Sequence, residues 1–216
     1  MNKKIILLPL LITLMIANSC FGQDSLRIYH LLPARFPAAA HQHSKTVSAI
    51  RWTDNSGEHV VTLEETGNYQ NPDLKHESDG MDAELFALHV CKSGLKTQQV
   101  WSLKDYVYDC PVDLEATFMK NMPMITDLDH DQVPEIWIMY QTVCHGDVSP
   151  LTVKIIMYEG VDKYAIRGES KVFGGTDEHG RTHYLGGSYK YDPAFAAQPL
   201  FLSFGDSLWK KYVLSE

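Results

Sequence analysis

The chain has 216 residues, 44% of them hydrophobic, and a formal net charge of −8 at pH 7. A chain of this size fits one domain with a sizeable buried core. An acidic protein repels phosphate backbones, so the charge argues against nucleic acid as a partner and suits a divalent cation.

The first 22 residues have the layout of a secretory signal peptide. Lys3 and Lys4 give a positive start, an apolar run covers residues 5–17, and small and polar residues follow. This order is typical of export signals. The run is shorter than the roughly 20 residues that a transmembrane helix needs, and no later stretch is long enough. We therefore expect an exported protein that is periplasmic, anchored to the outer membrane or secreted, with no transmembrane span.

Two cleavage sites fit this segment. Cleavage after Gly22 leaves a single β-rich domain at residues 23–216, and the loss of two lysines and no acid changes the net charge from −8 to −10. The alternative is a loose lipobox at residues 17–20, in which Cys20 would carry a lipid anchor.

Three cysteines follow the signal peptide, and export permits a disulfide between two of them. Cys110 precedes a proline and Cys144 precedes a His-Gly pair, so both are expected at strand or loop ends. Cys91 lies in an apolar run and is expected to be a core thiol. We predict a Cys110–Cys144 disulfide, with Cys91–Cys110 as the alternative; either pairing leaves one thiol over.

Short β-forming runs, separated by turn signals about every 8 to 12 residues, continue along the chain. The predicted strands cover residues 49–52, 59–64, 84–92, 97–103, 135–142, 152–158, 164–167, 200–204 and 209–214. Helical patterns are restricted to 103–108 and 113–120, and residues 66–82 and 174–187 are expected to be exposed loops. The fold predicted is mainly β: antiparallel hairpins in a sandwich-like or partial propeller-like domain with one or two short helices.

An acidic loop is the best-defined chemical feature. Asp127, Asp129, Asp131 and Glu135 stand at relative positions 1, 3, 5 and 9. Close carboxylates repel one another, and Ca²⁺ accepts six to eight oxygens with flexible geometry. The spacing predicts a Ca²⁺ site, with the backbone carbonyl near Val133 and water completing the shell. An acidic turn without metal is the alternative.

The loop resembles the calcium loops of FG-GAP and VCBS repeats, which read roughly Asp-x-Asp-x-Asp-Gly-x-x-Asp before a strand. Asp127, Asp129 and Asp131 match the three leading acids, and Glu135 takes the place of the last. Gln132 stands where those repeats have glycine. The resemblance implies a calcium ligand set and covers about 15 residues.

A broader resemblance covers roughly a third of the chain. Its motifs are Cys110-Pro-x-Asp113, residues 125–129, 135–137, Tyr140, 144–150, 154–159 and 163–168. They resemble a family of secreted Bacteroidota proteins named for surface polysaccharide biosynthesis. The family name implies a genetic link to envelope glycans, but it supplies no reaction and no catalytic residues.

Other candidate sites have simpler structural interpretations. Residues 144–150 contain Cys, His, Asp and Ser, which could form a nucleophilic set, but Asp147 and Ser149 also fit a turn before Pro150. Two histidine pairs could bind zinc but are expected to be solvated: His41 with His43, and His179 with His183.

Aromatic residues give two further expectations. The four tryptophans are mostly core residues: Trp52, Trp101, Trp137 and Trp209. Three tyrosines of the C-terminal region could stack on sugar rings, because aromatic faces offer apolar area with a polar rim: Tyr184, Tyr189 and Tyr191.

The sequence therefore favours a non-catalytic, calcium-stabilised module that binds an envelope glycan or envelope protein. A glycan-active hydrolase that uses Asp127 or Glu135 is the first alternative. A secreted interaction protein without metal is the second. No catalytic residue is assigned, and the oligomeric state is left open.

Overall fold

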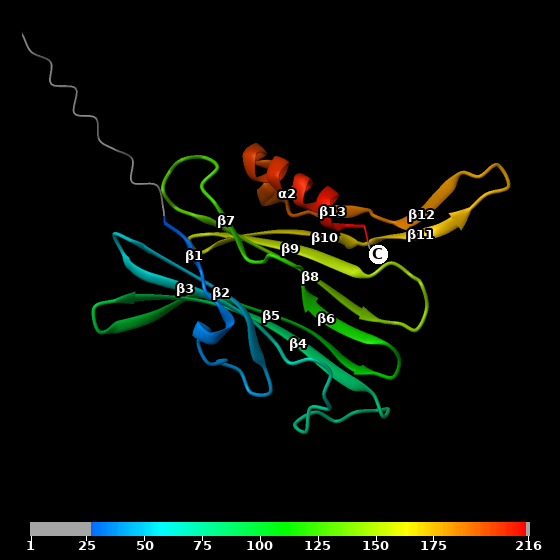
Figure 1. Cartoon of the computed structure of the whole chain (residues 1–216), viewed down its shortest axis with the longest axis horizontal. Helices are drawn as coiled ribbons and strands as arrows, with labels where there is room; N and C mark the ends of the chain where they lie inside the picture. Colours follow the sequence, from blue (N-terminus) through cyan, green and yellow to red (C-terminus); the bar gives the residue numbers. More distant parts are fainter. Residues whose placement is uncertain (1–26, 215–216) are drawn as a thin grey trace, which may run out of the picture.

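The computed structural model describes residues 27–214 (Figure 1). The predicted signal peptide, its two cleavage sites and Cys20 lie outside the described residues. The chain is 53% strand and 11% helix, in antiparallel sheets with two short α-helices, so the mainly β prediction is confirmed. Among residues 27–214, no helix is long and apolar enough to cross a membrane.

The first sheet is an antiparallel meander of five strands in the order β1-β2-β3-β4-β5. Its strands are β1 (Tyr29–His30), β2 (Lys45–Asp54), β3 (Gly57–Glu65), β4 (Met81–Ser93) and β5 (Lys96–Cys110). A 3-10 turn, η1 (Pro33–Arg35), lies between β1 and β2.

The second sheet has the order β13-β10-β9-β8-β6, and β7 also pairs with β8. Its strands are β6 (Leu114–Phe118), β7 (Met124–Thr126), β8 (Glu135–Cys144), β9 (Thr152–Glu159), β10 (Asp162–Glu169) and β13 (Tyr189–Tyr191). A separate hairpin joins β11 (Lys171–Thr176) to β12 (Thr182–Gly186), and the helices are α1 (Pro193–Ala196) and α2 (Pro199–Tyr212).

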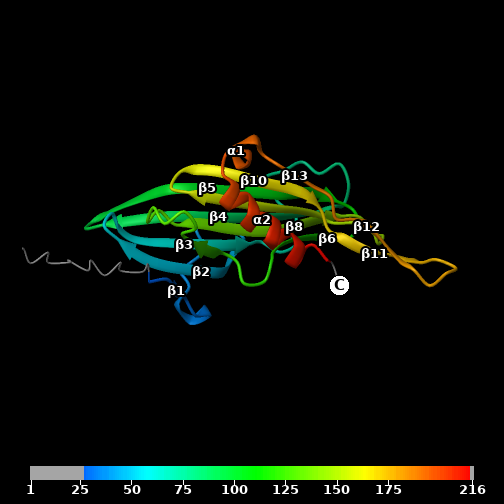
Figure 2. The same ribbon diagram turned by 90° about the horizontal axis from the view of Figure 1, so that it is seen from above.

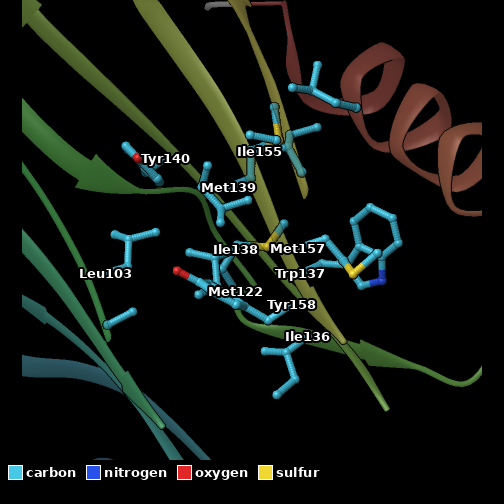
Figure 3. Packing of buried hydrophobic residues seen from close by; sticks show 14 of the residues in the cluster. Leu103, Met122, Ile136, Trp137, Ile138, Met139, Tyr140, Ile155, Met157 and Tyr158 are labelled. Atoms are coloured by element: carbon cyan, nitrogen blue, oxygen red, sulfur yellow. The ribbon is translucent and has the colours of Figure 1, made fainter. Parts of the chain in front are cut away.

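The two sheets and helix α2 form three layers (Figures 1 and 2). Between the sheets, the rings of Trp101 and Tyr158 stack with their centroids 4.1 Å apart. On the far face of the second sheet, the Trp137 ring lies 4.8 Å from that of Phe204 in α2. The second sheet is therefore buried on both faces, which explains why β8 and β9 are almost continuously apolar (Figure 3). All four tryptophans are buried, as predicted.

Three secondary-structure predictions were wrong. The helical patterns at 103–108 and 113–120 belong to β5 and β6, because alternate side chains such as Leu103 pack inward with period two. The predicted C-terminal hairpin at 200–214 is mostly helix α2, whose buried residues Phe201, Leu208 and Trp209 recur at helical spacing. Residues 174–187 are exposed as predicted, but most of them form the β11–β12 hairpin.

The predicted disulfide is confirmed. Cys110 at the end of β5 is bonded to Cys144 at the end of β8, with their Cα atoms 5.7 Å apart. The bond ties the first sheet to the second. Cys91 is the free thiol among the described residues, and it is partly exposed, so the prediction that it is a core thiol was wrong.

Buried carboxylates fix two loops to the outer face of the first sheet. Glu64 accepts hydrogen bonds from Ala40 N (2.8 Å) and Ser44 Oγ (2.7 Å) in the loop before β2. Asp82 accepts one from Asn71 N (2.7 Å), in the loop before β4, and lies 2.7 Å from the Nε2 atom of His76 in the same loop. Burial alone would raise the pKa of both carboxyls, but these hydrogen bonds, together with one from Asp109 N to Asp82 Oδ1 (2.8 Å), outweigh it and hold each pKa below its usual value.

These two loops are therefore expected to loosen in acid. A carboxyl whose pKa is lowered by folding stabilises the fold above its unfolded pKa of about 4, and the contribution is lost as the pH falls through the lower folded pKa. The protection factors for amide hydrogen exchange, which correct for slower intrinsic exchange in acid, should fall in residues 37–44 and 68–78 below pH ~4 before they fall in the sheets. An equal fall in protection across loops and sheets at that pH would contradict this assignment.

Candidate metal centre

The acidic loop is closed at its base by strand pairing. Thr126 ends β7 and lies opposite Glu135, the first residue of β8. Thr126 Oγ1 donates to Glu135 Oε2 (2.6 Å) and accepts from the indole N–H of Trp137 (2.7 Å). The intervening acids must therefore fold into a compact turn anchored on a buried tryptophan.

Two residues in the left-handed region turn the loop back on itself. His130 has φ +62° and Gln132 has φ +73°. Gln132 thus adopts the conformation that glycine takes most readily. The Gln132 N–H points to Asp127 Oδ1 (3.4 Å), and the Val133 N–H donates to Asp131 Oδ1 (2.7 Å). The loop therefore makes its sharp turn with Gln132 at the position where the FG-GAP and VCBS repeats have glycine.

Replacing Gln132 with glycine is expected to stabilise the protein. Glycine removes the steric cost of a positive φ, which is about 1 kcal/mol for a residue with a side chain. The urea midpoint should therefore rise, while the m-value, the slope of the unfolding free energy against urea concentration, stays constant. Gly160, which has φ +56° in the neighbouring turn, offers a control, since Gly160→Ala should lower the midpoint. A lower midpoint for Gln132→Gly would contradict the proposed strain.

Loop folding brings the acids together in two overlapping groups. Asp127, Asp129 and Glu135 offer oxygens that all lie within 4.8 Å of one another, and so do Asp129, Asp131 and Glu159. Asp129 belongs to both groups. Each of these residues offers carboxylate oxygens, the ligand type that Ca²⁺ prefers.

Glu159 is the member that sequence reasoning missed. It ends β9, 24 positions after Glu135, and lies directly opposite Glu135 in the β8–β9 ladder. Only the strand register reveals this, because the residue's sequence neighbours predict a simple turn at Glu159-Gly160. With Glu159 included, the site is formed by two segments, the β7–β8 loop and the end of β9.

The electrostatics of the cluster disfavour full ionisation. Glu135 is fully buried, and burial raises its pKa, with the charge of Asp129 adding to the effect despite hydrogen bonds from Thr126 and Leu128. Burial also raises the pKa of Glu159, helped by the charges of Asp129, Asp131 and Glu135. A cation bound between them would reverse this cost, because it favours the charged carboxylates.

Val133 lies at the rim of the loop. Its side chain is 39% exposed, and its Cγ1 atom would lie 3.9 Å from a Cβ added to Gly160, so the loop abuts the β9–β10 turn. Its carbonyl stays a predicted ligand.

The other candidate sites do not assemble a catalytic set. Cys144 is in the disulfide and so cannot act as a nucleophile. Asp147 Oδ1 accepts the Ser149 N–H (3.0 Å) and lies 3.1 Å from His145 Nδ1, as expected for the turn interpretation.

The histidines of the predicted pairs have separate partners. His41 contacts Glu64, His43 stacks on Tyr69, and His179 lies 3.6 Å from Glu178. His183 is exposed, and no three-residue metal group within residues 27–214 contains a histidine. Of the tyrosines proposed for sugar stacking, Tyr184 and Tyr191 are exposed, whereas Tyr189 donates its hydroxyl to Asp206.

A polar cluster between the sheets was not predicted. His59 Nδ1 lies 2.9 Å from His89 Nε2, and His59 Nε2 lies 3.1 Å from Asp54 Oδ1 and 3.6 Å from Cys91 Sγ. Burial, followed by the neighbouring His59, lowers the pKa of His89 to about 3. His89 is therefore neutral at physiological pH and serves as a hydrogen-bonded core residue.

Comparison with known proteins gives no relative for the chain: no family model, no curated protein and no solved structure matches it.

Proposed function

We propose that the chain is a non-catalytic, calcium-stabilised module, exported to the cell envelope or secreted, and associated with surface polysaccharide. The observation that carries the proposal is the gathering of four carboxylates around that of Asp129, with a fully buried one, Glu135, at the base of the loop. Asp127, Asp129, Asp131 and Glu135 would hold the ion, with Glu159 as an added ligand and the Val133 carbonyl at the rim.

Calcium would act here as a clamp between two strands. Burial, together with repulsion between the acids, raises the pKa values of Glu135 and Glu159, and the ion would offset both effects. It would also tie the β7–β8 loop to the end of β9. Because the unfolded chain lacks this arrangement, binding would stabilise the folded protein by mass action. The link to surface polysaccharide rests on the motif resemblance, and Tyr184 and Tyr191 remain candidates for stacking on sugars.

Hydrolysis of glycans is less well supported. Glycosidases use two opposed carboxyls about 5 to 10 Å apart across a cleft. Asp127 and Glu135 belong to a single group with ligand oxygens within 4.8 Å. A pocket of about 460 Å³ between β7 and the end of α2 is lined by His30, Asn121, Met124, Ile125, Lys211 and Tyr212, with no carboxylate.

Thermal unfolding of the mature protein, with millimolar calcium or with EDTA, tests the proposal. We expect a higher midpoint with calcium, and a smaller effect of magnesium, which demands a stricter octahedral geometry. An equal midpoint in calcium and EDTA would refute the clamp and favour an interaction protein without metal.

A further inference from the structure

The β11–β12 hairpin projects from the body as an arm (Figures 1 and 2). The arm, residues 171–186, is a two-stranded sheet that pairs with neither larger sheet. It exposes large apolar side chains: Phe173 is 59%, Tyr184 44% and Leu185 51% exposed. An isolated two-stranded hairpin is at best marginally stable in water, so an arm of this kind gains from an added strand.

The root of the arm is held firmly. The Lys171 N–H donates to Val213 O (2.7 Å), and buried Ser170 links to Leu151 N (2.9 Å) and Gly187 N (2.9 Å). Gly186 has φ +71°, and a Cβ there would lie 2.2 Å from the Ser170 carbonyl oxygen. The direction of the arm is therefore set by the body before any partner arrives, which lowers the entropy cost of binding.

The two free edges of the arm differ in how they are protected. Natural proteins block edge strands with lysine, proline or a bulge. β11 carries Lys171 and a bulge between Phe173 and Gly175. β12 reads Thr-His-Tyr-Leu-Gly, with no lysine, no proline and no acidic residue. The β12 edge is thus the one open to pairing.

Charge favours contact between two arms. The arm contains Lys171 and Arg181 against Asp177 and Glu178, so its formal charge is 2 − 2 = 0, whereas the whole chain carries −8. Two copies that approach body to body would repel, but two arms bring together neutral surfaces.

We infer that β12 pairs antiparallel with β12 of a second copy of this chain, with the two-fold axis at Tyr184. In this register Thr182 faces Gly186 of the other copy and His183 faces Leu185, so every contact is repeated by symmetry. The pairing satisfies the free backbone groups of β12 and covers Tyr184 and Leu185. It is independent of calcium, but it competes with the proposed stacking of Tyr184 on sugars.

Sedimentation equilibrium of the mature protein in EDTA tests the pairing. The average mass should rise toward that of a dimer with concentration, and Leu185→Lys should raise the dissociation constant at least tenfold. Leu95→Lys makes the same change at a fully exposed site in the β4–β5 turn and should leave the dissociation constant unchanged.

Cross-linking gives a test that does not depend on losing a contact. Opposed residues in antiparallel strands have Cα atoms about 4.5 to 5.5 Å apart, within the range of a disulfide. With Cys91 replaced by serine, Tyr184→Cys should form a covalent dimer under mild oxidation, and Leu95→Cys should not. Equal cross-linking of the two variants, or a wild type that stays monomeric at every concentration, would overturn the inference, even if the arm bound a glycan or another protein.

Discussion

Replacing Cys110 and Cys144 together with alanine is expected to lower the free energy of unfolding by about 3 to 4 kcal/mol. The two residues are 34 positions apart, and the disulfide restricts the unfolded chain by closing that loop. The closed loop spans β6, β7, the acidic loop and most of β8. The disulfide therefore stabilises the segment that carries four of the five proposed carboxylate ligands, all but Glu159.

Urea unfolding of the double variant measures this effect. Cys91→Ala removes a thiol of the same size that forms no disulfide, and it should cost much less. A double variant that loses no more stability than Cys91→Ala would contradict the importance of the bond. Reduction of the wild type should reproduce the result of the double variant.

Asp129→Asn is expected to abolish stabilisation by calcium. At a calcium concentration about 100 times the dissociation constant, binding contributes about 2.7 kcal/mol. For a domain of this size, that corresponds to a rise in the melting midpoint of roughly 5 to 10 °C. Asp129 is common to both acidic groups, so the variant should gain almost none of this rise.

The same variant should be slightly more stable than the wild type in EDTA. The charge of Asp129 is among the causes that raise the pKa values of Glu135 and Glu159, and its removal relieves this repulsion. Asp147→Asn is the matched control, since Asp147 lies past the far end of β8 and is well exposed. A full calcium response in Asp129→Asn would show that the ion, if bound, is held elsewhere.

Local signals predicted most of the strands and the disulfide. Strand ends beside Pro111 and His145 pointed to Cys110 and Cys144, and runs rich in β-forming residues marked β8 and β9. The same signal failed at the C-terminus because Leu200 to Leu214 offers two apolar clusters around Gly205, which fit either a hairpin or a helix. Tertiary packing decides for the helix, since Gly205 allows α2 to lie against Ile166.

The candidate site was only partly visible in the sequence. Four regularly spaced acids predicted the loop, and in the structure all four belong to the two acidic groups. Glu159 joins through the β8–β9 register, which depends on pairing between strands and leaves no local signature. The conformation of Gln132 was also hidden, because a positive φ at a residue with a side chain is set by the closure of the loop rather than by the residue itself.

Isothermal titration of calcium into the metal-free mature protein tests the central claim most directly. We predict saturable binding that is lost in Asp129→Asn and retained in Asp147→Asn. The absence of any binding heat and of any bound metal at millimolar calcium, with a correctly folded wild type, would contradict the claim that these carboxylates form a calcium site.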